Sequence, residues 1–115
     1  MANYPEMYER LRTLMGQLGR EAPAAMGAFG SLHMASTADG ALPRKTKELM
    51  ALAIGIAAHC DGCIAYHVHD ALKAEASRAE VMETIGIAMM MGGGPSVIYG
   101  CEALEAVEQF ASSTD

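Results

Sequence analysis

A carboxylate, two cysteines and a histidine stand close together in this chain, at Glu48, Cys60, Cys63 and His67. Two cysteines three positions apart can cycle between a dithiol and a disulfide. A cysteine at the start of a helix has a lowered pKa, because unpaired backbone N–H groups and the helix dipole favour the thiolate. His67 follows Cys63 by one helical turn, so its imidazole can accept the thiol proton. The stretch therefore indicates redox chemistry at a pair of thiols.

Glu48 can join this group only through tertiary structure. If its helix and the next one form an antiparallel hairpin that turns near His59, residue 48 lies opposite about residue 70. Glu48 then faces His67, and His67 stands between Glu48 and Cys63. The order carboxylate, imidazole, thiol is that of an oriented base that activates a nucleophile. The spacing is consistent with a proton relay; the alternative for Glu48 is an exposed carboxylate that favours the helix dipole.

Two other roles are open for the cysteines. They can be small buried apolar residues, since free cysteines are commonly buried. They can also bind zinc, because His59, Cys60, Cys63, His67 and His69 are all suitable ligand types. Structural zinc sites usually take two ligand pairs from separate segments, and this chain has no second pair. We therefore predict neither a metal nor a cofactor.

The other cysteine, histidines and methionines are predicted to have structural roles. Cys101 is expected to be an inert buried thiol. His33 stands alone on an apolar helical face, which is typical of a core or interface residue. His69 is expected to point away from the cysteines, and His59 is assigned no role. Residues 89–91, all methionine, are expected in the core or at a subunit contact.

Composition limits the class of protein. The 115 residues predict one domain over residues 1–115, and an apolar content of 51% is high for so small a monomer. Part of the apolar surface is therefore expected between subunits. A net charge of −6 with only eight Lys and Arg argues against binding to nucleic acids or anionic membranes.

Location is predicted from the lack of export and membrane signals. The charged N-terminal segment does not resemble a signal peptide. The longest apolar run, residues 49–58, is shorter than the about 20 residues of a membrane-spanning helix. The expected location is the cytoplasm, where paired cysteines are more often catalytic or metal-binding than structural.

Helical periodicity without strand-like alternation predicts an all-α fold. The six expected helices cover residues 5–19, 23–35, 43–58, 61–74, 77–91 and 95–111, followed by a polar tail at 112–115. Ser77 and Glu80 form a capping-box pattern, and the glycines at 92–94 end a helix.

Two of these helices have apolar patterns that predict burial. In the first helix the apolar residues share one stripe that we expect to be buried: Met7, Leu11, Leu14, Met15 and Leu18. The third helix is apolar on every face after Glu48, so it should be central and surrounded. Ala51 and Gly55 on that helix should let another helix approach closely.

Residues 45–76 contain KTKELMALA, CDGC and YHVHDALKAEA, and they resemble the carboxymuconolactone decarboxylase/alkylhydroperoxidase D superfamily. The resemblance is to its short alkylhydroperoxidase D-like members with a CxxC, and it continues through MMMGGGP and the last helix. The specific part is the pattern E-x11-C-x2-C-x3-H. One position departs from the fullest peroxidase pattern, which has a histidine where this chain has Gly62.

The resemblance implies an all-helical homo-oligomer, a trimer or a hexamer built from dimers, with peroxiredoxin-type activity as a thiol-dependent peroxidase or disulfide reductase. It implies that Cys63 attacks a peroxide and becomes a sulfenic acid. Cys60 would resolve it and then exchange with an external dithiol: a lipoyl protein, thioredoxin or a small thiol. Glu48 and His67 would form the proton relay.

Three questions stay open at this point. The helix-terminus argument by itself favours Cys60 as the more acidic thiol, whereas the resemblance makes Cys63 the attacking one. Lactone decarboxylation, the other chemistry of the superfamily, needs a proton donor and an anion site rather than thiols. A non-enzymatic helical oligomer that binds a metal or a partner is the third possibility.

Overall fold

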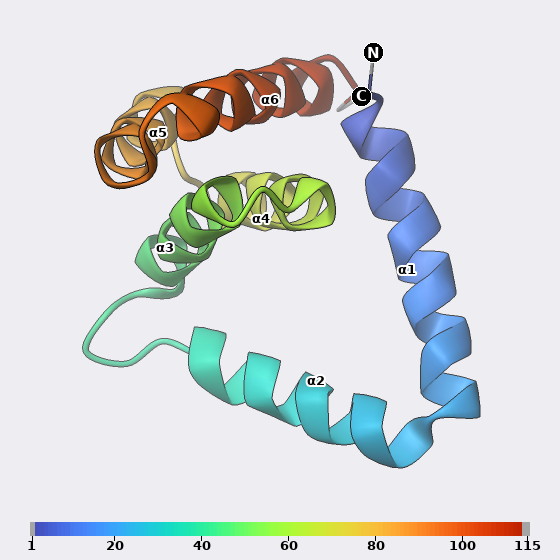
Figure 1. Cartoon of the computed structure of the whole chain (residues 1–115). Helices are drawn as coiled ribbons and strands as arrows, with labels where there is room; N and C mark the ends of the chain where they lie inside the picture. Colours follow the sequence, from blue (N-terminus) through green and yellow to red (C-terminus); the bar gives the residue numbers. More distant parts are fainter. Residues whose placement is uncertain (1, 114–115) are drawn as a thin grey trace.

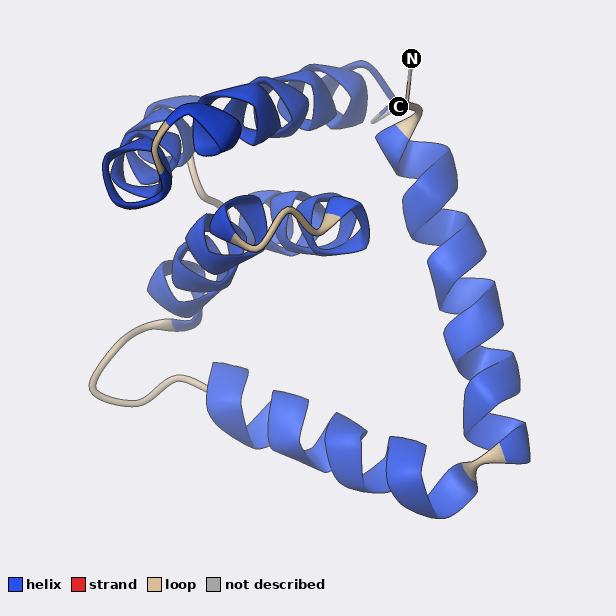
Figure 2. Ribbon diagram, viewed as in Figure 1, coloured by secondary structure: helices blue, strands red, loops and turns tan. Residues whose placement is uncertain are grey.

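The structure is a computed structural model that describes residues 2–113, and this range contains six α-helices and no strand (Figure 1 and Figure 2). The helices are α1 (Tyr4–Glu21), α2 (Pro23–Thr37), α3 (Arg44–Ala57), α4 (Asp61–Lys73), α5 (Arg78–Gly92) and α6 (Gly94–Ser113). The predicted all-α fold with six helices is confirmed. No helix in the described part of the chain has the length and apolar content needed to cross a membrane.

Local signals set most helix boundaries. Asn3 caps α1 by accepting the backbone N–H of Glu6, and Ser77 and Glu80 form the predicted capping box of α5 in both directions. Gly93 has φ +71°, a conformation that favours glycine, and it separates α5 from α6. The polar tail was predicted wrongly in part, because residues 112–113 continue α6; residues 114–115 lie outside the described residues.

The core lies between α3, α4, α5 and α6. Its fully buried apolar side chains include Leu52, Ile56, Ile64, Val68 and Val81. An ion pair of 3.0 Å between Lys45 Nζ and Glu80 Oε2 joins α3 to α5. The backbone N–H of Ser77 and then Lys45 hold the pKa of the Glu80 carboxyl below its usual value. These contacts form one body that carries the predicted redox residues.

Helix α1 is attached to this body at its N-terminal end. Tyr4 is fully buried; its hydroxyl donates to Glu102, and its backbone N–H donates to Gln109 Oε1 over 2.7 Å. Burial and the Glu102 carboxylate raise the pKa of the Tyr4 hydroxyl above its usual range. Tyr8, one turn on, is also buried and packs against Tyr66 of α4 and Phe110 of α6.

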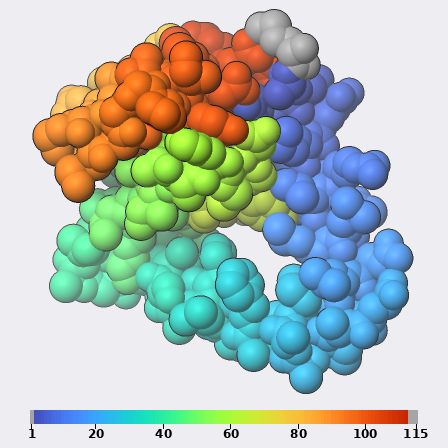
Figure 3. All heavy atoms as spheres, in the orientation of Figure 1, coloured from blue at the N-terminus to red at the C-terminus, as the bar shows by residue number. Residues whose placement is uncertain are grey.

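The rest of α1 and most of α2 form an arm that extends from the body, and the C-terminal part of α2 comes back beside α3 (Figure 1, Figure 3). The predicted burial of the α1 stripe is wrong at its C-terminal end, where Leu14, Met15 and Leu18 are exposed. On α2, Phe29 and Leu32 are more than half exposed. The apolar periodicity is present, but beyond Leu11 the single chain supplies no element for the stripe to pack against. Figure 3 shows an open gap between the arm and the body.

Two further expectations about burial are wrong, and a third keeps only one of its two alternatives. Met50 and Ile54 of α3 are exposed, so α3 is packed on one side but not surrounded. The methionines at 89–91 are exposed and are not core residues; a role in a subunit contact stays a prediction. Cys101 is an exposed free thiol rather than a buried one, because it lies beside the buried face of α6 that Gly100 and Ala103 occupy.

Candidate redox site

Cys60 and Cys63 form a disulfide at the start of α4, with their Cα atoms 5.2 Å apart. Cys60 is the N-cap of α4, and its Sγ accepts the backbone N–H of Cys63 over 3.2 Å. Both residues are half-buried, so they do not serve as core residues. The predicted pairing is thus present, and the N-terminus of α4 stabilises negative charge on Cys60 Sγ when the bond is reduced.

A tight turn at His59 places this pair. His59 has φ +57°, an uncommon conformation for a residue other than glycine, in which histidine is nevertheless enriched. Its ring stacks on Tyr99 of α6, with centroids 4.8 Å apart. The turn reverses the chain between α3 and α4 and brings Cys60 back against the end of α3, where its N–H donates to the carbonyl of Gly55.

Gly55 provides the closest approach between the two helices. A Cβ atom at this position would lie 2.9 Å from Cys63 Cβ, which is closer than real Cβ contacts. The expected close helix approach at Gly55 is therefore confirmed. Gly55 meets Cys63 and Glu48 meets His67, which is the pairing of an antiparallel hairpin.

Replacing Gly55 with alanine is expected to lower the free energy of unfolding by about 1–3 kcal/mol, because the added methyl group forces the α3–α4 contact apart. Urea denaturation of the reduced protein measures this change. The control is Gly86→Ala on α5, where an added Cβ has no neighbour within 4 Å. That variant should be neutral or slightly stabilised, since alanine favours a helix more than glycine does. Equal stability of the two variants would contradict the contact at Gly55.

Glu48 and His67 meet across the two helices as predicted. Glu48 Oε1 lies 2.9 Å from His67 Nδ1; the Glu48 side chain is fully buried, and 19% of the His67 side chain is exposed. Full burial excludes the alternative of an exposed carboxylate. An ionised carboxylate only accepts hydrogen bonds, so Nδ1 carries the proton and leaves Nε2 of a neutral imidazole able to accept another.

The link from His67 to the thiols is less direct. His67 lies one turn after Cys63 on α4, but no hydrogen bond joins it to either sulfur within residues 2–113. The carboxylate–imidazole half of the predicted relay is therefore in place, and proton transfer from Cys63 to His67 stays a prediction.

Position 62, where the resembling peroxidases have a histidine, lies under α1. A Cβ on Gly62 would be 3.2 Å from Leu11 Cδ1, which is a tight contact with the end of a flexible side chain. A larger side chain would have to push Leu11 aside. A residue larger than glycine at position 62 would therefore meet α1.

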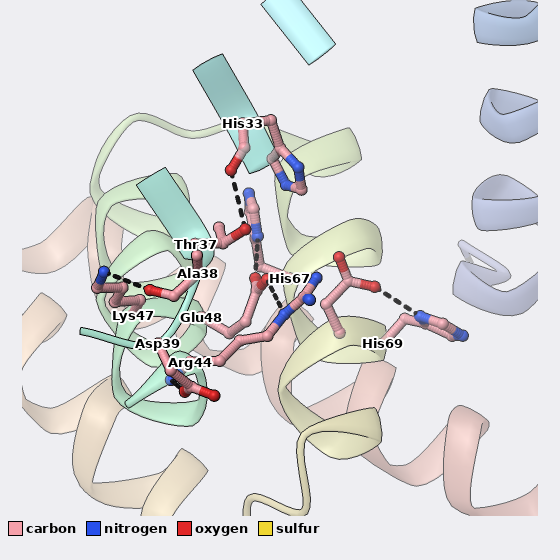
Figure 4. A network of polar contacts seen from close by, with 10 residues as sticks. His33, Thr37, Ala38, Asp39, Arg44, Lys47, Glu48, His67 and His69 are labelled. Atoms are coloured by element: carbon pink, nitrogen blue, oxygen red, sulfur yellow. Dashed lines mark hydrogen bonds and ion pairs between the residues drawn. The ribbon is translucent and has the colours of Figure 1, made fainter. Parts of the chain in front are cut away.

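Other groups lie around Glu48 that the sequence did not predict there (Figure 4). Arg44 Nε lies 3.9 Å from Glu48 Oε2, at the edge of a cavity of about 220 Å³ that Asp70, Lys73 and Ala74 also line. His33 was predicted to be an isolated core or interface residue, but it shares a cluster with Glu48 and Asp70. A hairpin register that places residue 48 opposite about residue 70 was the available signal for Asp70.

His69 is not part of the cluster of His33, Glu48 and Asp70, but it contacts Asp70 from outside. Its ring stacks on Tyr8 of α1 with centroids 3.8 Å apart, and its Nδ1 is 2.9 Å from Asp70 Oδ1. The side chain therefore contacts α1 rather than the cysteines.

Comparison with known proteins shows the family and its fold. The sequence model of the carboxymuconolactone decarboxylase family matches residues 23–106. The chain belongs to the carboxymuconolactone decarboxylase family. A crystal structure of the apo form of a family member from Legionella pneumophila has a TM-score of 0.91 at 44% identity, over 94% of this chain and 96% of that one. An uncharacterized protein of Cupriavidus necator is 43% identical over 77% of this chain and 79% of its own length.

A family protein of Thermotoga maritima, for which a part in the antioxidative response has been suggested, superposes with a TM-score of 0.83 at 30% identity. The match covers 93% of this chain and 91% of that one. The family includes enzymes, and the fold with its CxxC pair is compatible with alkylhydroperoxidase D-like activity.

Proposed function

We propose that this protein is a thiol-dependent peroxidase or disulfide reductase that uses the Cys60–Cys63 pair. The observation that carries the proposal is the buried Glu48–His67 hydrogen bond of 2.9 Å, one turn of α4 from the end of a CxxC disulfide. A carboxylate that orients an imidazole beside a nucleophile is a recurrent way to activate that nucleophile. The suggested antioxidative role of the Thermotoga maritima relative points the same way.

The proposed cycle has three balanced steps. His67 takes the Cys63 proton, and the Cys63 thiolate attacks the peroxide O–O bond, which gives a sulfenic acid and an alkoxide that leaves as an alcohol after receiving a proton. The Cys60 thiolate attacks the sulfenic sulfur, which forms the disulfide and releases water. An external dithiol then exchanges with the disulfide, becomes oxidised itself and restores both thiols.

The two cysteines are activated by different groups in this scheme. The backbone N–H of Cys63 stabilises a thiolate on Cys60, and the Glu48–His67 pair serves as the base for Cys63. A thiolate is needed twice, first to attack the peroxide and then to attack the sulfenic acid. The helix-terminus argument and the family roles therefore apply to different steps and do not conflict.

The proposed function also implies a reductant, a compartment and an oligomeric state. An exchangeable disulfide requires a reducing compartment with a dithiol donor such as a lipoyl protein, thioredoxin or a small thiol, which is consistent with the cytoplasm. We also propose that the chain forms a trimer or a hexamer. Support comes from the exposed apolar side chains of the arm, among them Phe29 and Leu32, since monomers rarely expose large apolar patches.

Thiol trapping with intact-mass spectrometry tests the function. The reduced chain is alkylated before and after one equivalent of peroxide. We expect all three cysteines to be alkylated before treatment; afterwards only Cys101 should react, because Cys60 and Cys63 have lost two hydrogens to a disulfide. Cysteines that stay fully alkylatable after peroxide would overturn the proposal.

A further inference from the structure

His33, Glu48 and Asp70 come from three different helices, α2, α3 and α4, and meet beside the Glu48–His67 pair. A ring nitrogen of His33 and one carboxylate oxygen of each acid lie within 4.8 Å of one another. We propose that these three side chains bind a divalent transition-metal ion. This site is separate from the cysteines and does not depend on the proposed thiol chemistry.

Glu48 provides the strongest reason for an ion at this place. Its side chain is fully buried, and its Oε1 is held by His67, but its Oε2 has no hydrogen-bond partner. Arg44 Nε forms a long ion pair with Oε2 at 3.9 Å, but its side chain is half exposed and the distance is too great for a hydrogen bond. A buried carboxylate oxygen without a hydrogen bond is unfavourable, so a closer donor or cation would stabilise it. A metal ion between Glu48 Oε2, His33 and Asp70 supplies the cation.

The surrounding groups resemble the outer ligands of metal sites. His67 Nδ1 is 2.9 Å from Glu48 Oε1, and His69 Nδ1 is 2.9 Å from Asp70 Oδ1. Each carboxylate thus has one oxygen held by a histidine, which leaves the other oxygen available to an ion. Figure 4 shows the side chains of His33, Glu48 and His67 gathered between the helices that carry them.

Ligand type and spacing indicate the class of metal. Ligand atoms at about 2.0–2.2 Å from one ion lie roughly 3–3.5 Å apart, so the present 4.8 Å limit requires closure by about 1 Å through side-chain rotation. One imidazole and two carboxylates suit first-row divalent ions such as Zn²⁺ and Mn²⁺. The two carboxylate charges balance such an ion. The nearby cations Arg44 and Lys73 oppose it. The 220 Å³ cavity that they line together with Asp70 gives room for water beside Asp70.

The test is calorimetric titration of the reduced, chelator-treated full chain with Zn²⁺. We expect wild type to bind one ion per chain. In His33→Ala and in Asp70→Asn the affinity should be at least about tenfold weaker than in wild type. The double variant Cys60→Ser/Cys63→Ser should bind as wild type does, and so should His59→Ala, which removes a histidine next to the cysteines. Circular dichroism establishes that each variant is folded; Asp70→Asn changes a charge at nearly constant shape.

Co²⁺ gives a second readout that distinguishes binding at His33, Glu48 and Asp70 from binding at the cysteines. Co²⁺ bound to His33, Glu48 and Asp70 should show visible d–d bands without the near-ultraviolet thiolate charge-transfer band. Three results would overturn the proposal: no binding by wild type, unchanged binding in His33→Ala and Asp70→Asn, or loss of binding in the cysteine double variant. Failure of the peroxide test would leave these expected results unchanged, so the two proposals fail separately.

Discussion

Replacing Cys63 with serine is expected to abolish turnover of peroxide with an external dithiol. A serine hydroxyl does not form the sulfenic acid that the cycle requires, and Cys60 then has no partner for a disulfide. The measurement is steady-state consumption of an organic hydroperoxide with a dithiol reductant in excess. Rates should fall to the background of the reaction without protein.

Two further variants make this result specific. Cys101→Ser removes the exposed thiol of α6 that lies outside the pair and should leave turnover as in wild type. Cys60→Ser should also stop turnover, but a sulfenic acid should accumulate on Cys63 and be trapped by a dimedone-type reagent. Full turnover in Cys63→Ser would show that Cys63 is not the attacking thiol. A sulfenic acid on Cys60 in that variant would reverse the two assigned roles.

Replacing Glu48 with glutamine is expected to lower the maximal rate about a hundredfold or more, the low end of the effect of a positioned acid–base group. Glutamine has nearly the same shape but carries no charge, so it neither fixes the Nδ1–H tautomer of His67 nor stabilises the imidazolium that forms when the thiol proton arrives. The apparent KM for peroxide should change little, because Glu48 is fully buried and holds the base rather than the substrate.

The matched control for this variant is Glu83→Gln on α5, where the same chemical change falls on an exposed side chain. It should have the activity of wild type. All proteins are treated with chelator before assay, so that loss of a metal ion bound to Glu48 does not enter the comparison. A Glu48→Gln protein that is folded and as active as Glu83→Gln would remove Glu48 from the mechanism.

The helices and the reactive motif could be predicted from local sequence signals. Pro5, Pro23 and the Ser77–Glu80 capping box act within a turn or two of chain, so helix positions could be read without the tertiary structure. The Cys60–Cys63 pair is local for the same reason. Glu48 and His67 were also predicted to meet, because two helices joined by a short turn have a nearly fixed register.

Which apolar faces are covered, and which distant groups meet, depends on how the helices pack and could not be predicted from local signals. Leu14 and Leu18 have the same periodicity as the buried Tyr4 and Tyr8, but the body of the protein ends before it reaches them. Cys101 is exposed because its helical phase places it just off the buried face of α6. Periodicity shows that a face is apolar but does not show what lies against it.

His33 illustrates the same limit for the site. It joins Glu48 and Asp70 because the C-terminal part of α2 lies beside α3, and the path of the loop at residues 38–43 that connects the two helices depends on packing rather than on local propensity. Long-range contacts of this kind depend on how whole helices pack against one another. The chemistry within one hairpin was therefore readable from sequence, whereas the group that a third helix adds to it was not.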